Sequence, residues 1–228
     1  MRKTTLAAAC FVLMVLSGFG SARAAYTYTT LVASSTYANG ISGNNIVGYY
    51  LDASSNAHGF LYNGTSYTTL DVPGGGGTSA NGISGNNIVG SGGNGHGFLY
   101  NGTSYTTVNV PGSAYTSANG ISGSNIVGDY ADGSGGGYGF LYNGTSYTTV
   151  NVPGSASTSA NGIDGSNIVG DYQDASGNEH GFLYNGTSYT TLDVPGASST
   201  YAYGISGSNI VGYYVDASDN DCAFMATP

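Results

Sequence analysis

Positive charge is almost absent from this chain. Its 228 residues contain 3 basic side chains, at Arg2, Lys3 and Arg23, against 12 acidic ones. Beyond residue 23 there is no lysine or arginine, so the remainder has a formal charge of −12 with histidine neutral. A nucleic-acid-binding protein needs cations that displace phosphate counterions, so this absence excludes nucleic acid as a partner. It excludes binding to anionic membrane surfaces for the same reason.

Long apolar runs and cysteines are equally scarce. The one apolar run covers residues 6–16, after Met1-Arg2-Lys3 and before Ala22-Arg23-Ala24. This layout is typical of a secretory signal peptide, and the run is too short for a membrane span of roughly 20 residues. We therefore expect a signal peptide at 1–24, cleavage near Ala24, and a secreted, extracellular or periplasmic domain at 25–228 without membrane insertion. Cys222 would then be the only cysteine, so no internal disulfide can form.

A repeated sequence fills the rest of the chain. The tripeptide Ile-Val-Gly begins at residues 46, 88, 126, 168 and 210, and GFLYNGTSYTT occurs four times without change, at 59–69, 97–107, 139–149 and 181–191. A period of about 42 residues indicates a repeat architecture. The second copy is four residues shorter, where the other copies read DASSN, DGSGG, DASGN or DASDN. A deletion that spares its flanks marks a surface loop.

Each repeat has the pattern of four short strands. In the fourth copy they are expected at 158–163, 167–172, 180–184 and 188–194. Asn185-Gly186 lies between the last two and predicts a type I′ hairpin turn, in which both residues need positive φ. Both faces of each strand carry apolar or aromatic residues, which is typical of sheets stacked face to face. No segment of the mature chain shows helical periodicity.

The two ends of the repeat region are complementary. The last copy stops within its third strand, at Ala223-Phe224-Met225, while residues 26–31 read YTYTTL and match the missing fourth strand. We therefore predict an all-β fold, a five-bladed β-propeller of four-stranded blades, closed by the N-terminal strand completing the last blade. The alternative is an open β-solenoid, which would need atypical caps at its ends.

The repeats resemble the HAF repeat, a bacterial extracellular repeat family named for a His-Ala-Phe motif. Three copies carry it as His58-Gly59-Phe60, His96-Gly97-Phe98 and His180-Gly181-Phe182, whereas the third reads Tyr138-Gly139-Phe140 and the last Cys222-Ala223-Phe224. The resemblance covers residues 26–228. It implies a bacterial source, secretion and a repeat architecture, and it implies no defined activity.

Four loops suggest a cation site. They begin at Asp52, Asp132, Asp174 and Asp216 and read D-x-S-x-(N/G), with oxygen donors of the kind that Ca²⁺ binds. Asx turns explain the same loops without an ion, so Ca²⁺ is the one cofactor left open and none is expected. His58, His96 and His180 occupy equivalent positions, which are too far apart in a propeller for one metal ion. A structural role is therefore expected for them. Cys222 stands where other copies have histidine and is interpreted as a small buried residue, the alternative being an intermolecular disulfide.

Catalysis requires residues that break the repeat, because an active site is built once. The acidic residues that do so are Asp129, Asp164, Asp171, Glu179, Asp219 and Asp221. A glycosidase needs two positioned carboxylates, and the spacing of these six singles out no pair. Motifs for a nucleophile elbow, a zinc protease or a phosphate loop are missing. We therefore assign no catalytic residues.

These observations lead to three functional hypotheses. The first is a secreted, monomeric, non-enzymatic binding or surface-interaction module, with carbohydrate as the favoured ligand and glycans or other extracellular surfaces as partners. Its basis is the Tyr, Asn, Asp and Ser content of the loops, which suits sugar recognition. The ligand-binding residues remain unassigned. The alternatives are a structural extracellular or envelope component without a small ligand, and a glycosidase on the same scaffold.

Overall fold

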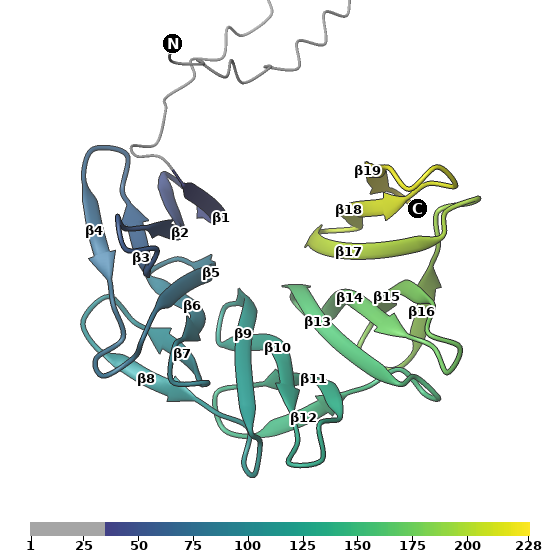
Figure 1. Ribbon diagram of the computed structural model, residues 1–228, viewed down its shortest axis with the longest axis horizontal. Helices are drawn as coiled ribbons and strands as arrows, with labels where there is room; N and C mark the ends of the chain where they lie inside the picture. Colours follow the sequence, from purple (N-terminus) through teal and green to yellow (C-terminus); the bar gives the residue numbers. More distant parts are fainter. Residues whose placement is uncertain (1–34) are drawn as a thin grey trace, which may run out of the picture. The chain divides into compact units, whose positions relative to one another are not determined.

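The structure is a computed structural model that describes residues 35–228, which form nineteen strands in five antiparallel sheets (Figure 1). Blade 1 consists of β1 (Thr36–Ser42), β2 (Asn45–Leu51), β3 (Ala57–Tyr62) and β4 (Tyr67–Leu70). Blade 2 consists of β5 (Thr78–Ser84), β6 (Asn87–Gly92), β7 (Gly97–Tyr100) and β8 (Tyr105–Val108). Blade 3 consists of β9 (Tyr115–Ser122), β10 (Asn125–Ala131), β11 (Gly137–Tyr142) and β12 (Tyr147–Val150). Blade 4 consists of β13 (Ser157–Asp164), β14 (Asn167–Gln173), β15 (Glu179–Tyr184) and β16 (Tyr189–Leu192). Blade 5 consists of β17 (Ser199–Ser206), β18 (Asn209–Val215) and β19 (Asp221–Ala226).

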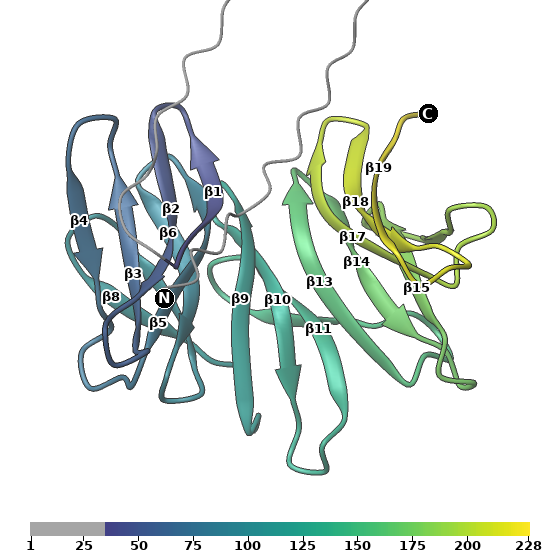
Figure 2. The same ribbon diagram turned by 45° about the horizontal axis from the view of Figure 1, so that its top comes forward.

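The blades are arranged around a common centre. The first strands β1, β5, β9, β13 and β17 lie on the inner side and the fourth strands on the outer side, as Figures 1 and 2 show. Within each sheet the strands are paired in chain order, and consecutive blades contact one another through their first strands. This is the architecture of a five-bladed β-propeller. The prediction of an all-β propeller is confirmed, and the linear solenoid is excluded.

The hydrophobic core lies between the blades. Phe60, Phe98, Phe140 and Phe182 are each at most 2% exposed. Phe182 of blade 4 belongs to one cluster with Val127 and Val150 of blade 3, and Phe98 and Phe140 likewise join their own blades to the preceding ones. One aromatic ring per repeat therefore supplies one junction, as the regular occurrence of phenylalanine indicates.

A β-bulge in the first strand of each blade forms a second contact across the junction. In blade 4 the pairing of β13 with β14 shifts between Ala160 and Gly162, which leaves Asn161 between them. The Asn161 side-chain amide donates a hydrogen bond to the backbone carbonyl of Ala202 in blade 5, at 3.0 Å. Asn39, Asn81 and Asn119 make the equivalent bonds at the three earlier junctions. The bulge thus turns a polar side chain towards the next blade.

The expected hairpin between the third and fourth strands is present, but the predicted turn type is wrong. Tyr184 pairs with Tyr189, so the connection has four residues rather than two. Only Gly186 adopts a positive φ, of 92°. The side-chain oxygen of Asn185 accepts hydrogen bonds from the backbone N–H groups of Thr187 and Ser188. This Asx-type turn replaces the type I′ turn because the asparagine side chain satisfies the backbone donors itself.

Blade 5 differs from the others at its outer edge. Among residues 35–228, β19 has β18 as its one strand partner, and Phe224 is half-buried where its counterparts are fully buried. The signal peptide, its cleavage site and the closing strand expected at 26–31 lie outside the described residues. In residues 35–228, no helix has the length and apolar character needed to cross a membrane.

Candidate ligand sites at the blade junctions

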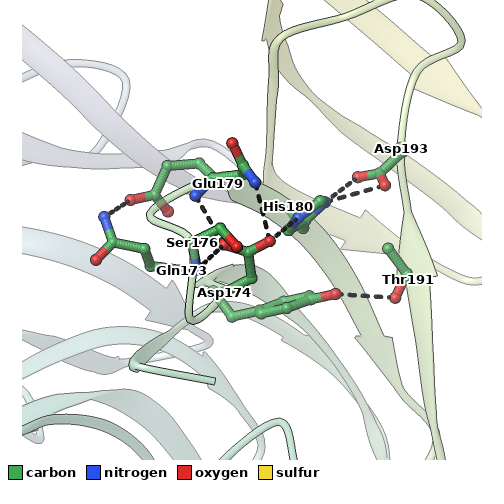
Figure 3. A network of polar contacts seen from close by, with 9 residues as sticks. Gln173, Asp174, Ser176, Glu179, His180, Thr191 and Asp193 are labelled. Carbon is green, nitrogen blue, oxygen red and sulfur yellow. Dashed lines mark hydrogen bonds and ion pairs between the residues drawn. The ribbon is translucent and has the colours of Figure 1, made fainter. Parts of the chain in front are cut away.

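The carboxylates of the four loops suggested as calcium sites accept hydrogen bonds from donors within their own loops. In blade 4, Oδ1 of Asp174 accepts hydrogen bonds from the backbone N–H groups of Ser176 and Asn178, at 2.8 and 2.9 Å (Figure 3). Oδ2 accepts a third from the Asn178 side chain, at 3.0 Å. Asp52, Asp132 and Asp216 likewise accept bonds from the backbone N–H groups two and four residues on. This is the geometry of the Asx-turn alternative.

These hydrogen bonds stabilise the ionised carboxylates. The pKa of Asp52 is lowered to about 2, chiefly by the side-chain and backbone donors of Asn56. The pKa values of Asp132, Asp174 and Asp216 are also lowered, mainly by donors of the same kind within each loop. In the described part of the chain, no group of three His, Cys, Asp or Glu side chains is placed to hold a metal ion.

Two of the three histidines lie between carboxylates. His180 places Nδ1 3.0 Å from Oδ2 of Asp193 and Nε2 3.5 Å from Oδ2 of Asp174, and its ring stacks on Tyr172 with centroids 5.1 Å apart (Figure 3). His58 repeats this arrangement in blade 1, with Asp71 and Asp52. Both ring nitrogens of each histidine lie beside aspartate carboxylates. Neither nitrogen is therefore placed to take a proton from a hydroxyl or thiol nucleophile.

The carboxylates determine the charge state of these histidines. The hydrogen bond to Asp71 is the largest effect on His58 and raises its pKa. For His180, burial alone lowers the pKa, but Asp193 and Asp174 together raise it. In blade 2 the position differs, because Nδ1 of His96 lies 2.9 Å from the side-chain oxygen of Asn109, a neutral partner. Only blades 1 and 4 therefore hold a histidine between two negative charges.

Among the acidic residues that break the repeat, Asp171 lies near enough to Glu179 and Asp129 for their charges to raise its pKa, in addition to the larger effect of burial. Asp129 and Asp171 are largely buried, and each accepts a 2.7 Å hydrogen bond, from Asn119 and Asn161 respectively. Burial raises the pKa of both, that of Asp171 to about 6. The two asparagines bridge to different blades, so these carboxyls belong to successive junctions.

Asp164, Asp219 and Asp221 occupy separate positions. Asp164 accepts a hydrogen bond from the backbone N–H of Gly207, and Asp219 lies in the last loop at a positive φ of 62°. Asp221 is exposed at the start of β19. Glu179 accepts a hydrogen bond from the Gln173 side chain, at 2.9 Å.

A polar cleft of about 200 Å³ lies beside His180. Its lining residues are Glu179, His180, Asp193 and the linker residues 194–200. Glu179 and Asp193 both line this cleft. The sequence alone did not indicate that these two carboxylates lie near each other. Asp193 has a counterpart at Asp71 in blade 1, so it is not among the acids that break the repeat.

A larger pocket, of about 540 Å³, lies at the junction of blades 2 and 3. Val110 and Pro111 of the linker form part of its lining, and the remainder consists of Tyr130, Phe140 and residues 145–149. The phenol of Tyr130 lies 3.2 Å from the Thr149 hydroxyl. The pocket thus combines two tyrosine rings with the hydroxyls of Thr145, Ser146, Thr148 and Thr149.

The tyrosine–threonine pair recurs in one further described blade. In blade 4, the Tyr172 phenol lies 3.1 Å from the Thr191 hydroxyl, and Pro153 occupies the position of Pro111. Blade 2 has Gly92 in place of this tyrosine. The sequence could not identify the pocket at Tyr130, because it is formed by residues from two neighbouring repeats. The signal that was present is the tyrosine four residues after each Ile of Ile-Val-Gly, which only the second copy lacks.

No protein-family model matches the chain, and no curated protein matches it. Among solved structures, the SapL1 lectin in complex with alpha methyl fucoside has a TM-score of 0.52 at 14% identity, over 86% of this chain and 82% of that chain. A six-bladed β-propeller lectin of Aleuria aurantia has a TM-score of 0.48 at 15% identity, over 83% and 72%. YCF48 bound to D1 peptide has a TM-score of 0.43 at 10% identity, over 85% and 70%. The likeness to the SapL1 lectin concerns the fold, which is a β-propeller in this chain as well.

Proposed function

We propose that this protein is a secreted, non-enzymatic carbohydrate-binding module on a closed five-bladed propeller. The observation that carries the proposal is the pocket at the junction of blades 2 and 3, which joins the rings of Tyr130 and Tyr147 to four hydroxyl side chains. The C–H face of a sugar packs well on an aromatic ring, and its hydroxyls exchange hydrogen bonds with Ser and Thr. An apolar lining with a few convergent polar groups is also the usual composition of a small-ligand site.

The negative charge of the chain limits which glycans it could bind. Acidic sugars carry a carboxylate or sulfate, which proteins usually bind through Arg or Lys. The chain has neither residue beyond position 23, and its carboxylates would repel an anionic ligand. The proposed ligands are therefore neutral sugars.

The comparisons and the repetition of the Tyr–Thr pair support this proposal. The SapL1 lectin, whose fold is similar, was solved in complex with a sugar. In the present chain the Tyr–Thr pair at Tyr130 recurs at Tyr172. A second site at Tyr172, on the same scaffold, would give avidity for a surface that displays many copies of a glycan.

A glycan array tests the proposal. The purified protein should give a saturable signal on neutral glycans that free sugar competes away. Changing Tyr130→Ala and Tyr172→Ala together should weaken that binding at least tenfold. Tyr203→Ala serves as the matched control, because Tyr203 is half exposed on β17 and lies outside the described pockets. An empty array, or equal binding by both variants, contradicts the proposal, and an empty array favours the structural-component alternative.

A second candidate, glycoside hydrolysis, is favoured by one observation. Glu179 and Asp193 share the lining of the cleft beside His180. Two carboxylates that flank a glycosidic bond are the minimum for this reaction. Hydrolysis of neutral polysaccharides that is abolished by Glu179→Gln and by Asp193→Asn would establish this activity in place of simple binding.

Export from the cytoplasm is part of the proposal and is supported by the signal-peptide layout of residues 1–24 and by the HAF-repeat resemblance. Mass spectrometry of secreted material should find a chain that begins near Ala25. An intact Met1 on soluble exported protein would contradict cleavage.

A further inference from the structure

His180 contacts three parts of blade 4 that meet beside the Tyr172–Thr191 pair. It pairs with Tyr172 across β14 and β15, and the two rings stack with centroids 5.1 Å apart and planes at 27°. Nδ1 lies 3.0 Å from Oδ2 of Asp193, two residues after Thr191, and Nε2 lies 3.5 Å from Oδ2 of Asp174 in the β14–β15 loop (Figure 3). The imidazole therefore joins the Tyr172 ring to the end of the fourth strand.

This arrangement is complete only when the ring is protonated. An imidazolium has two N–H donors and can bond both aspartates, whereas a neutral imidazole has one donor and turns a lone pair towards the other carboxylate. The cation is also attracted to the face of the Tyr172 ring. Burial lowers the pKa of His180, but Asp193 and Asp174 outweigh burial and raise the pKa above its usual value of 6.5. Loss of the proton at alkaline pH leaves the two carboxylates without a counterion and weakens the stack.

Two further carboxyl groups lie near His180. Glu179 lines the same cleft and accepts a hydrogen bond from the Gln173 side chain. Asp171 lies on the opposite face of β14 from Tyr172, where it accepts the hydrogen bond from Asn161. The linker residues of the cleft, 194–200, have no titratable side chain. Because the pKa of Asp171 is about 6, a test of His180 has to separate the two groups.

Blade 3 has the same tyrosine–threonine pair without the imidazole. Tyr138 stands where blade 4 has His180, and its ring lies against that of Tyr130 with centroids 5.5 Å apart. Asn151 replaces the aspartate that His180 meets at Nδ1. Tyrosine side chains ionise only near pH 10, so blade 3 has no imidazolium at this position. The phenol–hydroxyl distances of the two pairs, 3.2 and 3.1 Å, are alike, and the charge beside the tyrosine differs.

We propose that His180 is a positioning residue that makes sugar binding at Tyr172 dependent on pH, while binding at Tyr130 is not. This role rests on the proposed function, because it takes the tyrosine–threonine pairs as the sugar contacts. At acidic pH the imidazolium holds the Tyr172 ring beside Thr191, so a sugar meets a preformed surface. At alkaline pH the ring and the Asp193 segment are no longer joined, and binding has to order them first. The protein then holds a glycan surface less tightly at alkaline than at acidic pH.

Calorimetric titration with the neutral methyl glycoside that the glycan array selects tests this role. Tyr130→Ala leaves the blade 4 site alone, and Tyr172→Ala leaves the blade 3 site alone. In Tyr130→Ala the affinity at pH 5.5 should exceed that at pH 9 by about threefold or more, because the stacked cation is present only at the lower pH. In Tyr172→Ala the two affinities should agree.

The residue found in blade 3 supplies the decisive variant. In the Tyr130→Ala background, His180→Tyr keeps an aromatic ring against Tyr172 and removes the imidazole, so sugar binding should persist and become independent of pH. Where this variant does not fold, His180→Gln replaces it and should bind at both pH values as weakly as the histidine protein does at pH 9. His58→Gln is the matched control, because His58 has the same surroundings in blade 1, and it should leave the pH dependence unchanged.

Every other result contradicts a definite claim. Equal affinities at the two pH values in Tyr130→Ala contradict the role of His180. A pH dependence that survives both His180 variants does so too, and its loss in Asp171→Asn would assign it to that carboxyl. No binding by Tyr130→Ala, with binding by Tyr172→Ala, shows that Tyr172 forms no site and overturns the inference while the proposed function stands. No binding by the unaltered protein contradicts the proposed function itself.

Discussion

The buried carboxyl of Asp171 makes the stability of the fold depend on pH. Burial raises its pKa to about 6, with smaller contributions from Glu179 and Asp129, against a lowering hydrogen bond from Asn161. Because the folded pKa lies above the usual value of 3.8, protonation favours the folded state. The stabilising effect is complete below pH 4 and is lost as the pH rises through about 6.

Asp171→Asn should therefore stabilise the protein at pH 8 and have little effect at pH 4. The amide oxygen of the new residue can still accept the hydrogen bond from Asn161, while the buried charge is removed. The expected gain at pH 8 is on the order of 1 to 3 kcal/mol, seen as a higher Tm. Asp221→Asn, at an exposed position, is the control and should show no comparable gain. A gain of equal size at both pH values would show that charge is not the cause.

Gly170 is a position where no side chain fits. A Cβ atom there would overlap the backbone carbonyl oxygen of Ser159 and lie 2.8 Å from the ring of Phe182. Gly170→Ala should therefore lower the free energy of unfolding by about 3 kcal/mol or more, because backbone and core must both move. Gly133→Ala is the control, since a Cβ there has no neighbour within 4 Å. Urea denaturation should separate the two, and similar midpoints would show that the backbone at Gly170 yields.

At the scale of the element, the local sequence predicts where the strands lie. It does not predict the contacts between blades. Alternating apolar and aromatic residues place strands at 167–172 and 180–184, and the structure has them at Asn167–Gln173 and Glu179–Tyr184. The bulge at Asn161 has no signal in a single repeat, because its function is to bond the backbone of the next blade. The turn at Asn185 was predicted with the wrong type, because Asn-Gly also suits a longer loop in which the asparagine side chain satisfies the backbone.

The hydrogen bonds that asparagine side chains donate to the next blade, here called asparagine bridges, should contribute unequally to the free energy of unfolding. Asn161→Ala leaves the carbonyl of Ala202 without this donor, and it also removes the donor to Asp171. A buried polar group left unpaired costs about 1 to 3 kcal/mol. Asn39→Ala removes the corresponding bond to Ala80 at a more exposed position and should cost less. Denaturation midpoints measure both, and equal losses would show that burial does not set the strength of the bridge.

For the whole molecule, carboxylate repulsion is nearly unopposed. The ion pairs in residues 35–228 all join a histidine to an aspartate, at His58 and His180. Moderate NaCl should therefore raise the Tm, because screening weakens the repulsion over a Debye length of about 10 Å at 0.1 M.

Melting curves at matched ionic strength in NaCl, MgCl₂ and CaCl₂ also test for calcium. Because the Asp52-type carboxylates already accept hydrogen bonds from their own loops, we expect equal shifts in the three salts. A much larger shift with CaCl₂ would establish calcium binding at these loops. No response to NaCl would show that the repulsion is weak.

The number of blades was predictable from the sequence, whereas the candidate pockets were not. Five Ile-Val-Gly tripeptides give five blades, because each repeat forms one sheet. The pocket at Tyr130 needs Val110 and Pro111 from the preceding repeat, and the cleft at His180 needs the linker to blade 5. A pattern within one repeat cannot show which residues of two repeats come together.

The asparagine bridge also bears on how such a chain changes over generations. A blade donates this bond to the blade that follows and accepts the same bond from the blade before, through the same residue types. A gene that gains or loses one repeat length of coding sequence therefore encodes a chain whose remaining junctions keep their contacts. Recombination between its near-identical segments changes the number of blades by whole units, so blade number and blade sequence can be selected independently.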